Sequence, residues 1–177
     1  AVESGVTLTI EPGTIIKAVA GTGANASSLI IAKGAKIMAQ GTPAQPIIFT
    51  AESDNIQIGE IYGSSLNPNV RGLWGGIIIL GNAPGSFTGN VESFQIDGIP
   101  ASDINGLYGG TDPNDDSGVF QYVSIRHGGA EIGEGNEING LTLGCIGNGT
   151  IINNVEVVAN VDDGIEFFGG TVNADHL

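Results

Sequence analysis

Short apolar runs separated by turn-forming residues recur along most of this chain. The stretch 28–51, SLIIAKGAKIMAQGTPAQPIIFTA, shows the pattern most clearly. Its apolar runs are 29–31, 36–39 and 47–49. Each has the length of a β-strand and is too short for a helix. Glycine and proline separate the runs, so the stretch predicts strands joined by tight turns.

The same stretch repeats what precedes it. A shift of 21 positions places 8–18 (LTIEPGTIIKA) on 29–39 (LIIAKGAKIMA). Apolar residues then fall on apolar residues, and Gly13 falls on Gly34. A period of about 20 residues is typical of a solenoid. We therefore predict one all-β domain over 1–177, a right-handed parallel β-helix whose coils stack at a spacing of about 4.8 Å.

Two later pairs of segments echo one another in the same way. YVSI at 122–125 echoes NVEV at 154–157, and GLTL at 140–143 echoes GIEF at 164–167. We expect the members of each pair to occupy the same place in neighbouring coils. Strands are also predicted over 6–10, 14–19, 73–80, 119–125, 141–146 and 150–158.

Two segments break the pattern. Residues 52–72 are polar and irregular, and they predict a surface loop. Residues 82–117 form the longest stretch without periodicity, but they include Phe87, Phe94 and Tyr108. Long loops of this kind are uncommon unless they are functional or disordered. Because of its apolar residues, we predict that 82–117 is an ordered inserted loop packed on the solenoid.

Charge excludes several kinds of partner. Lysine and arginine total 5 against 19 acidic residues, which gives a net charge of -14. A nucleic-acid partner is not expected, because no cationic surface can neutralise phosphates. Docking on anionic lipid is disfavoured for the same reason, and no apolar run reaches the length of a membrane span. Cys145 and Trp74 lie in apolar runs and are expected to pack in the core, although Trp74 could instead stack on a sugar.

The segment DPNDDSG carries a candidate calcium site. Asp112, Asn114 and Asp116 place oxygen ligands at alternate positions before a glycine. Ca²⁺ binds such ligands in a sharply turning loop. The spacing only approaches an EF-hand loop, because the glycine is displaced and no glutamate closes the loop. The alternative is a solvated turn closed by hydrogen bonds from Asp and Asn side chains.

A second acidic group carries the candidate catalytic chemistry. Asp162 and Glu166 could act as acid and base in glycoside cleavage, or hold Ca²⁺ against an acidic sugar. Such an enzyme also needs a base or a cationic clamp, for which Arg126 and His127 are the candidates. The alternative for His127, which precedes two glycines, is a corner residue bonded to the backbone.

Several segments together resemble one family. The segments are LTIEPGTIIKA, LIIAKGAKIMAQGTPAQPIIFTA, LWGGIIILGNAP, NGLYGGTDPNDDSGVFQYVSIRHGG, NEINGLTLGCIGNGT and DDGIEFFGGTVN. The chain resembles the right-handed parallel β-helix repeat proteins that bacteria secrete or display on their surface, many of them lipoproteins. The resemblance implies a fold but no catalytic residues. Family members usually continue well beyond FFGGTVN, which implies that this chain is part of a longer one or a unit that stacks on others.

These observations favour a non-enzymatic extracellular module, on a bacterial cell surface or secreted, with a structural or adhesive role. Open ends of a β-helix expose unpaired strand edges, so copies are expected to associate end to end into fibres. A glycan is a possible partner. The alternative function is a polysaccharide-active enzyme, a lyase or a glycosidase, which uses the acidic residues named above.

Overall fold

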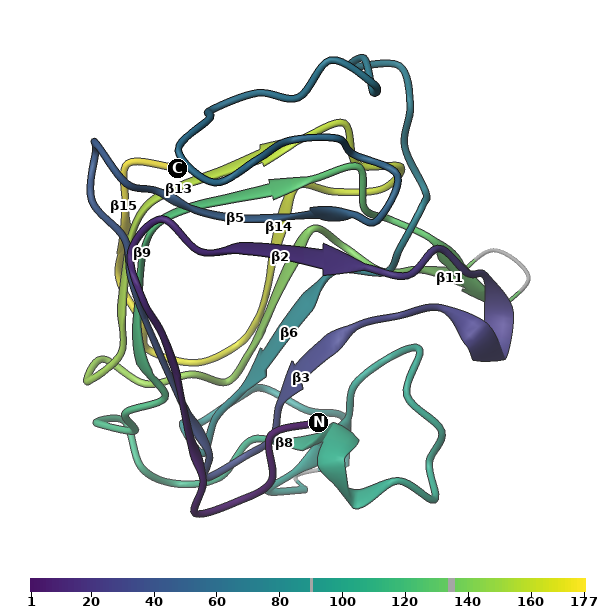
Figure 1. Ribbon diagram of the computed structural model, residues 1–177. Helices are drawn as coiled ribbons and strands as arrows, with labels where there is room; N and C mark the ends of the chain where they lie inside the picture. Colours follow the sequence, from purple (N-terminus) through teal and green to yellow (C-terminus); the bar gives the residue numbers. More distant parts are fainter. Residues whose placement is uncertain (90, 134–135) are drawn as a thin grey trace.

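The protein is a parallel β-helix. The computed structural model describes residues 1–89, 91–133 and 136–177. Figure 1 looks along the solenoid, where three sides enclose a roughly triangular section. No α-helix occurs in those residues. The predicted all-β, parallel β-helical class is confirmed.

Two of the sides form a single sheet. Sides 1 and 2 belong to one seven-stranded sheet that bends at the corner between them, and side 3 is a separate four-stranded sheet. Side 1 contains β1 (Thr7–Ile10), β4 (Lys36–Gln40), β15 (Ala174–Asp175) and the first parts of β9 (Gly118–Arg126) and β13 (Ile151–Val158). Side 2 contains β2 (Ile15–Ala18), β5 (Ile47–Ala51) and the second parts of β9 and β13. Side 3 contains β3 (Leu29–Ile31), β6 (Ile77–Leu80), β12 (Leu141–Gly144) and β14 (Ile165–Phe168).

The 21-residue repeat does not relate neighbouring coils, and that part of the prediction was wrong. Leu8 of β1 pairs with Ile37 of β4, whereas Leu29 lies on a different side, in β3. The physical reason is that every side of the solenoid has the same inward and outward alternation. Local similarity therefore does not distinguish the next side from the next coil.

The two later echoes predict the register correctly. Val155 of β13 pairs with Val123 of β9, and Ile165 of β14 pairs with Leu141 of β12. Both pairs join strands on one side of adjacent coils, as expected from the repeated motifs. The register is strongly specified here because a slip of one residue would turn each apolar side chain out of the core.

Inward-facing side chains from all three sides form the main core. It is rich in β-branched and aromatic residues, which pack well on a pleated surface. Among its fully buried members are Ile37, Phe49, Ile77, Ile79, Phe120, Ile125, Leu141 and Leu143. Phe49 and Phe120 stack with ring centroids 6.3 Å apart. Trp74 and Cys145 are also buried, as predicted.

The inserted loop 82–117, which we call the insertion, covers the outer face of side 3. Its Ile96 and Tyr108 form a second buried cluster with Ile78 and Leu80 of β6. Strand β6 is therefore buried on both faces, which explains why its sequence is apolar at every position. The predicted packing of the insertion on the solenoid is confirmed, except at residue 90, which lies outside the described residues.

Small elements complete the structure. Within the insertion, β7 (Phe94–Gln95) pairs antiparallel with β8 (Leu107–Tyr108), next to the 3₁₀ helix η2 (Ile104–Gly106). A second hairpin joins β10 (Glu131–Gly133) and β11 (Asn136–Glu137), and η1 (Gly23–Asn25) precedes β3. In the described part of the chain, no helix has the length and apolar character needed to cross a membrane.

Segment 52–72, which we call the strap, lies outside side 2. Figure 1 shows it arching over β5 before the chain enters β6. It covers Ile48 and Thr50, the outward-facing residues of β5, and both are fully buried. Thr50 donates a hydrogen bond of 2.9 Å to Asp54, at the start of the strap. The predicted loop is thus a covering layer with ordered contacts to the solenoid.

Candidate functional site

Arg126, a predicted catalytic residue, anchors the strap. Its side chain points outward from the end of β9 and is only 5 % exposed. The guanidinium donates to the Ile61 carbonyl at 2.6 Å and to the Ser124 hydroxyl at 2.7 Å. It also lies 5.2 Å from the ring centroid of Tyr62, in cation–π geometry. Its donors are therefore directed mainly at the protein itself.

The carboxylate nearest to Arg126 is Glu156. Glu156 Oε1 lies 3.4 Å from the guanidinium and accepts a 2.6 Å hydrogen bond from Ser124. The Glu156 side chain is 57 % exposed. The Ser124 and Glu156 positions pair in adjacent coils, so the register of β9 and β13 creates this network. The sequence motifs predicted that register but not the polar network on its outer face.

His127 also holds the strap. It lies at the corner after β9 with a φ of 61°, and its Nδ1 is 2.6 Å from the Val70 carbonyl. Its own carbonyl accepts from the Leu73 amide at 3.0 Å. The structure thus favours the alternative of a corner histidine bonded to the backbone. The neighbouring Trp74 is buried and donates to the Arg126 carbonyl at 2.7 Å.

The other two catalytic candidates lie elsewhere. Glu166 belongs to β14 on side 3, where it accepts a 2.6 Å hydrogen bond from Asn139. Asp162 is exposed in the turn before β14, and its carbonyl accepts from Asn160 at 3.2 Å. Two clefts flank Arg126, and among the described residues neither is lined by Asp162 or Glu166. The structure brings Arg126 and His127 together at the end of β9 and places Glu166 on side 3, whereas Asp162 lies in the turn stacked on the Gly128 corner, where the Val161 amide donates to the Gly128 carbonyl at 3.3 Å.

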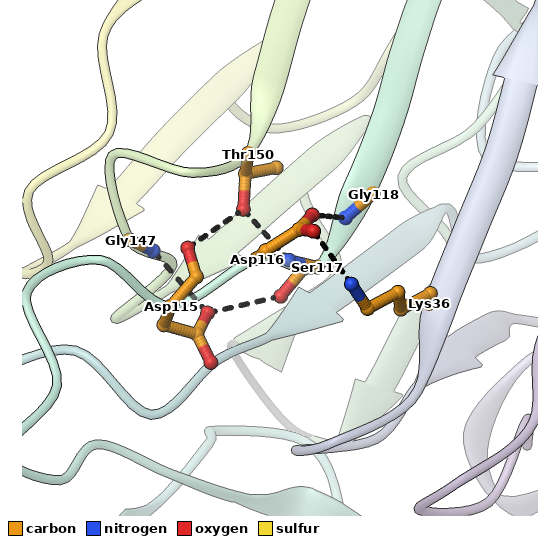
Figure 2. A network of polar contacts seen from close by, with 7 residues as sticks. All are labelled: Lys36, Asp115, Asp116, Ser117, Gly118, Gly147 and Thr150. Carbon is orange, nitrogen blue, oxygen red and sulfur yellow. Dashed lines mark hydrogen bonds and ion pairs between the residues drawn. The ribbon is translucent and has the colours of Figure 1, made fainter.

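The predicted calcium loop closes the insertion and leads into β9. Figure 2 shows its polar contacts with the turn of the next coil. Asp115 accepts hydrogen bonds from the Ser117 hydroxyl at 3.2 Å and the Gly147 amide at 3.3 Å. The Thr150 hydroxyl accepts from the Ser117 amide at 2.8 Å. The loop therefore fastens one coil to the next.

The carboxylates of Asp112 and Asp116, two of the three proposed calcium ligands, already have partners within the protein. Asp112 accepts from the Asn114 amide at 2.9 Å, which is a closed Asx turn. Asp116 accepts from the Gly118 amide at 2.8 Å and pairs with Lys36 at 2.5 Å. The hydrogen bond from Lys36 holds the pKa of Asp116 below its ordinary value. In the described residues no three His, Cys, Asp or Glu side chains are grouped to hold a metal ion. These contacts favour the closed turn, and calcium binding stays a prediction.

The structure adds a surface that the sequence did not reveal. At the end of the solenoid formed by β1, β2 and β3, an open cavity of about 530 Å³ leads into the core, and we call it the mouth. Its walls are the inward-facing Leu8, Ile10, Ile16, Ala18 and Leu29, with Phe49 and Trp74 deeper inside. The alternation of 6–10 indicated that Leu8 and Ile10 share a face. It did not indicate that this face is open.

One comparison with known proteins gives a match. The model of a family described as a pectate-lyase like beta helix domain matches residues 1–177. No curated protein and no solved structure matches the chain. The family match agrees with the parallel sheets and covers the whole chain.

Proposed function

The chain belongs to the family of pectate-lyase-like β-helix domains, and we propose that within this family it is a non-enzymatic structural and adhesive module that acts outside the cell. The family accommodates both structural modules and polysaccharide-active enzymes. The contacts of Arg126 and His127 with the strap support the structural alternative, since both side chains stabilise the fold. The low count of basic residues also supports a role without nucleic acid.

The mouth is the observation that carries the proposal. It exposes apolar side chains that equivalent coils bury, and β1 and β2 are the edge strands of their sides. Exposed strand edges favour pairing with a further strand. In a parallel β-helix all strands of one side run in the same direction, so a second copy that continues the sheets with parallel strands must add head to tail. Such an interface joins two different surfaces and generates an open filament.

The proposal is tested by the mass of the domain in solution. We expect the mass measured by light scattering to rise with protein concentration. Leu8→Glu places a charge in the mouth and should give a monomer at every concentration. Thr7→Glu is the matched control, because Thr7 lies on the same strand with an exposed side chain outside the mouth. A wild-type protein that remains monomeric, or a Leu8→Glu variant that associates like wild type, contradicts head-to-tail association.

A polysaccharide-active enzyme is the second candidate, and the family match is compatible with it as well. Its acidic residues would be Asp162 and Glu166, with Arg126 and His127 as clamp and base. The test is the appearance of new reducing ends or unsaturated products when the protein is incubated with polygalacturonate or neutral polysaccharides. We expect no products. Products that disappear with Glu166→Gln would establish the enzyme and exclude the non-enzymatic role.

A further inference from the structure

The corner between sides 1 and 2 carries an unusual column of residues. Strands β9 and β13 bend there at Tyr122 and Asn154, whose φ angles are 48° and 51°. These two residues occupy the same place in adjacent coils, between the paired positions on either side of the bend. The left-handed region is tolerated well by asparagine but poorly by a bulky aromatic residue. A tyrosine at this corner therefore makes the fold less stable than asparagine or glycine would.

Strain of this kind is found at functional sites more often than elsewhere, and here it adjoins a groove. The groove has a volume of about 480 Å³, within the range of ligand sites in proteins. Its walls come from five parts of the chain. They are the turn that contains Pro43 and Pro46, the strap at Ile61, strand β9 with Tyr122 and Ser124, strand β13 with Asn154 and Glu156, and the segment after β15 with His176 and Leu177.

The groove combines an aromatic ring with fixed polar groups. In the part of the chain that the structure describes, no protein hydrogen bond involves the hydroxyl of Tyr122. Glu156 is held through Oε1 by Ser124 and Arg126, its side chain is 57 % exposed, and no hydrogen bond to Oε2 is found among the described residues. Asn154 adds an amide oxygen one coil beyond Tyr122, while its Nδ2 donates to Asn153. An apolar ring face beside oriented hydrogen-bonding groups suits a ligand with apolar faces and many hydroxyls.

The charges in the groove determine the kind of ligand. Glu156 presents an exposed carboxylate, whereas the Arg126 guanidinium is 6 % exposed and already bound to the Ile61 carbonyl and Ser124. The protein as a whole has a net charge of -14. The other basic residue of the groove, His176, lies 3.1 Å from the Asp175 carboxylate. An acidic sugar would therefore meet repulsion from Glu156, and both basic residues that line the groove in the described part of the chain already face partners within the protein. A neutral sugar avoids that cost and can donate hydroxyl hydrogen bonds to Glu156.

We propose that the groove at the corner between sides 1 and 2 binds a neutral oligosaccharide, with a sugar ring stacked on Tyr122 and hydroxyls bonded to Glu156 and Asn154. The inference rests on the proposed adhesive, non-enzymatic function and names its partner. It does not depend on head-to-tail association, because the groove and the mouth are different surfaces.

Binding is measured by calorimetry on the full chain with the Leu8→Glu substitution, so that association does not interfere. The probes are the neutral cellohexaose and mannohexaose and the acidic hexagalacturonate. We expect at least one neutral probe to bind and hexagalacturonate to bind at least about tenfold more weakly or not at all. Absence of binding by both neutral probes, or a preference for hexagalacturonate, overturns the inference.

Three variants locate the site. Tyr122→Asn removes the ring at a backbone position that asparagine tolerates, and it should weaken binding about tenfold or more without loss of stability. Tyr122→Phe keeps the ring and should retain most of the affinity. Phe94→Asn removes an exposed ring from the insertion and should leave binding unchanged. Unchanged binding in Tyr122→Asn overturns the site. Chromatography of the bound probe separates the two proposals, since cleavage would contradict the non-enzymatic function while leaving the binding site supported.

Discussion

The role of Arg126 as the anchor of the strap leads to a measurable prediction. Arg126→Ala removes two short hydrogen bonds, to the Ile61 carbonyl at 2.6 Å and the Ser124 hydroxyl at 2.7 Å. It also removes the contact with the Tyr62 ring at 5.2 Å. Hydrogen bonds from a charged donor contribute about 1.5–3 kcal/mol each, and a cation–π contact about 0.5–1 kcal/mol.

These contributions do not add in full, because the buried guanidinium also loses hydration when the protein folds. We expect a net cost of about 3–5 kcal/mol, which comes from the two lost hydrogen bonds and from the Ile61 carbonyl left without its partner. Glu156 is 57 % exposed, so the substitution leaves no buried charge behind. Part of it should appear as local detachment of the strap, since the β-sheets do not depend on Arg126. A cost of about 3 kcal/mol corresponds to roughly a hundredfold faster exchange of strap amides.

The assay is amide hydrogen exchange followed by mass spectrometry, on peptides that cover the strap and, for comparison, β6 and β12. Exchange should accelerate in the strap far more than in the two strands. Arg71→Ala is the matched control, because Arg71 is an exposed arginine of the same strap. Arg71→Ala should change the free energy of strap detachment by no more than about 0.5 kcal/mol. If Arg126→Ala leaves strap exchange equal to that of Arg71→Ala, the argument that Arg126 is an anchor is refuted.

Three further predictions follow from buried or paired groups. Phe120→Ala removes a fully buried ring that stacks on Phe49, and it should lower the free energy of unfolding by about 3–5 kcal/mol in denaturant titration; a loss below about 1 kcal/mol would contradict close packing at that layer. The hydrogen bond from the exposed Lys36 lowers the pKa of Asp116 below its ordinary value. The stabilisation from this pair is therefore present above the ordinary pKa and is lost as pH falls through the pKa of the folded state. Lys36→Met should therefore lower the free energy of unfolding by at most about 1 kcal/mol at pH 7. The difference from wild type should vanish when unfolding is measured at a pH below the folded-state pKa of Asp116. An equal difference at all pH values would exclude the pair as its source. Burial raises the pKa of Cys145, so a thiol reagent should label it only after unfolding, and rapid labelling of the native protein would show that the outer cluster of side 3 opens readily.

Sequence patterns predicted the positions of the strands well, but they predicted which strands pair only in part. Repeated motifs gave the register of Val123 with Val155 and of Leu141 with Ile165, because these coils are joined without long insertions. Between the first coils the repeat matched β1 to β3 instead of β4. The same alternation serves every side, so only backbone hydrogen bonds between coils identify the partner strand.

The candidate site shows the same limit for side chains. Residue types alone suggested that Arg126, His127, Asp162 and Glu166 might act together. In the structure the first two meet strap carbonyls, and Glu166 lies on another side beside Asn139. A polar side chain at the end of a strand does not reveal which loop from a distant coil will cover it.

The sequence by itself determined the class of fold. Short alternating runs and abundant glycine predicted an all-β protein, and scarce basic residues argue against a nucleic-acid partner, because these properties depend only on local backbone preference and on total charge. Only the tertiary structure decided what the polar residues do. Arg126 and Ile61 are 65 positions apart in the chain, and Lys36 and Asp116 are 80 apart. Contacts at such separation depend on how the strap and the insertion fold back onto the solenoid, and the folding of the strap likewise brings Ile61 to the groove that Tyr122 lines.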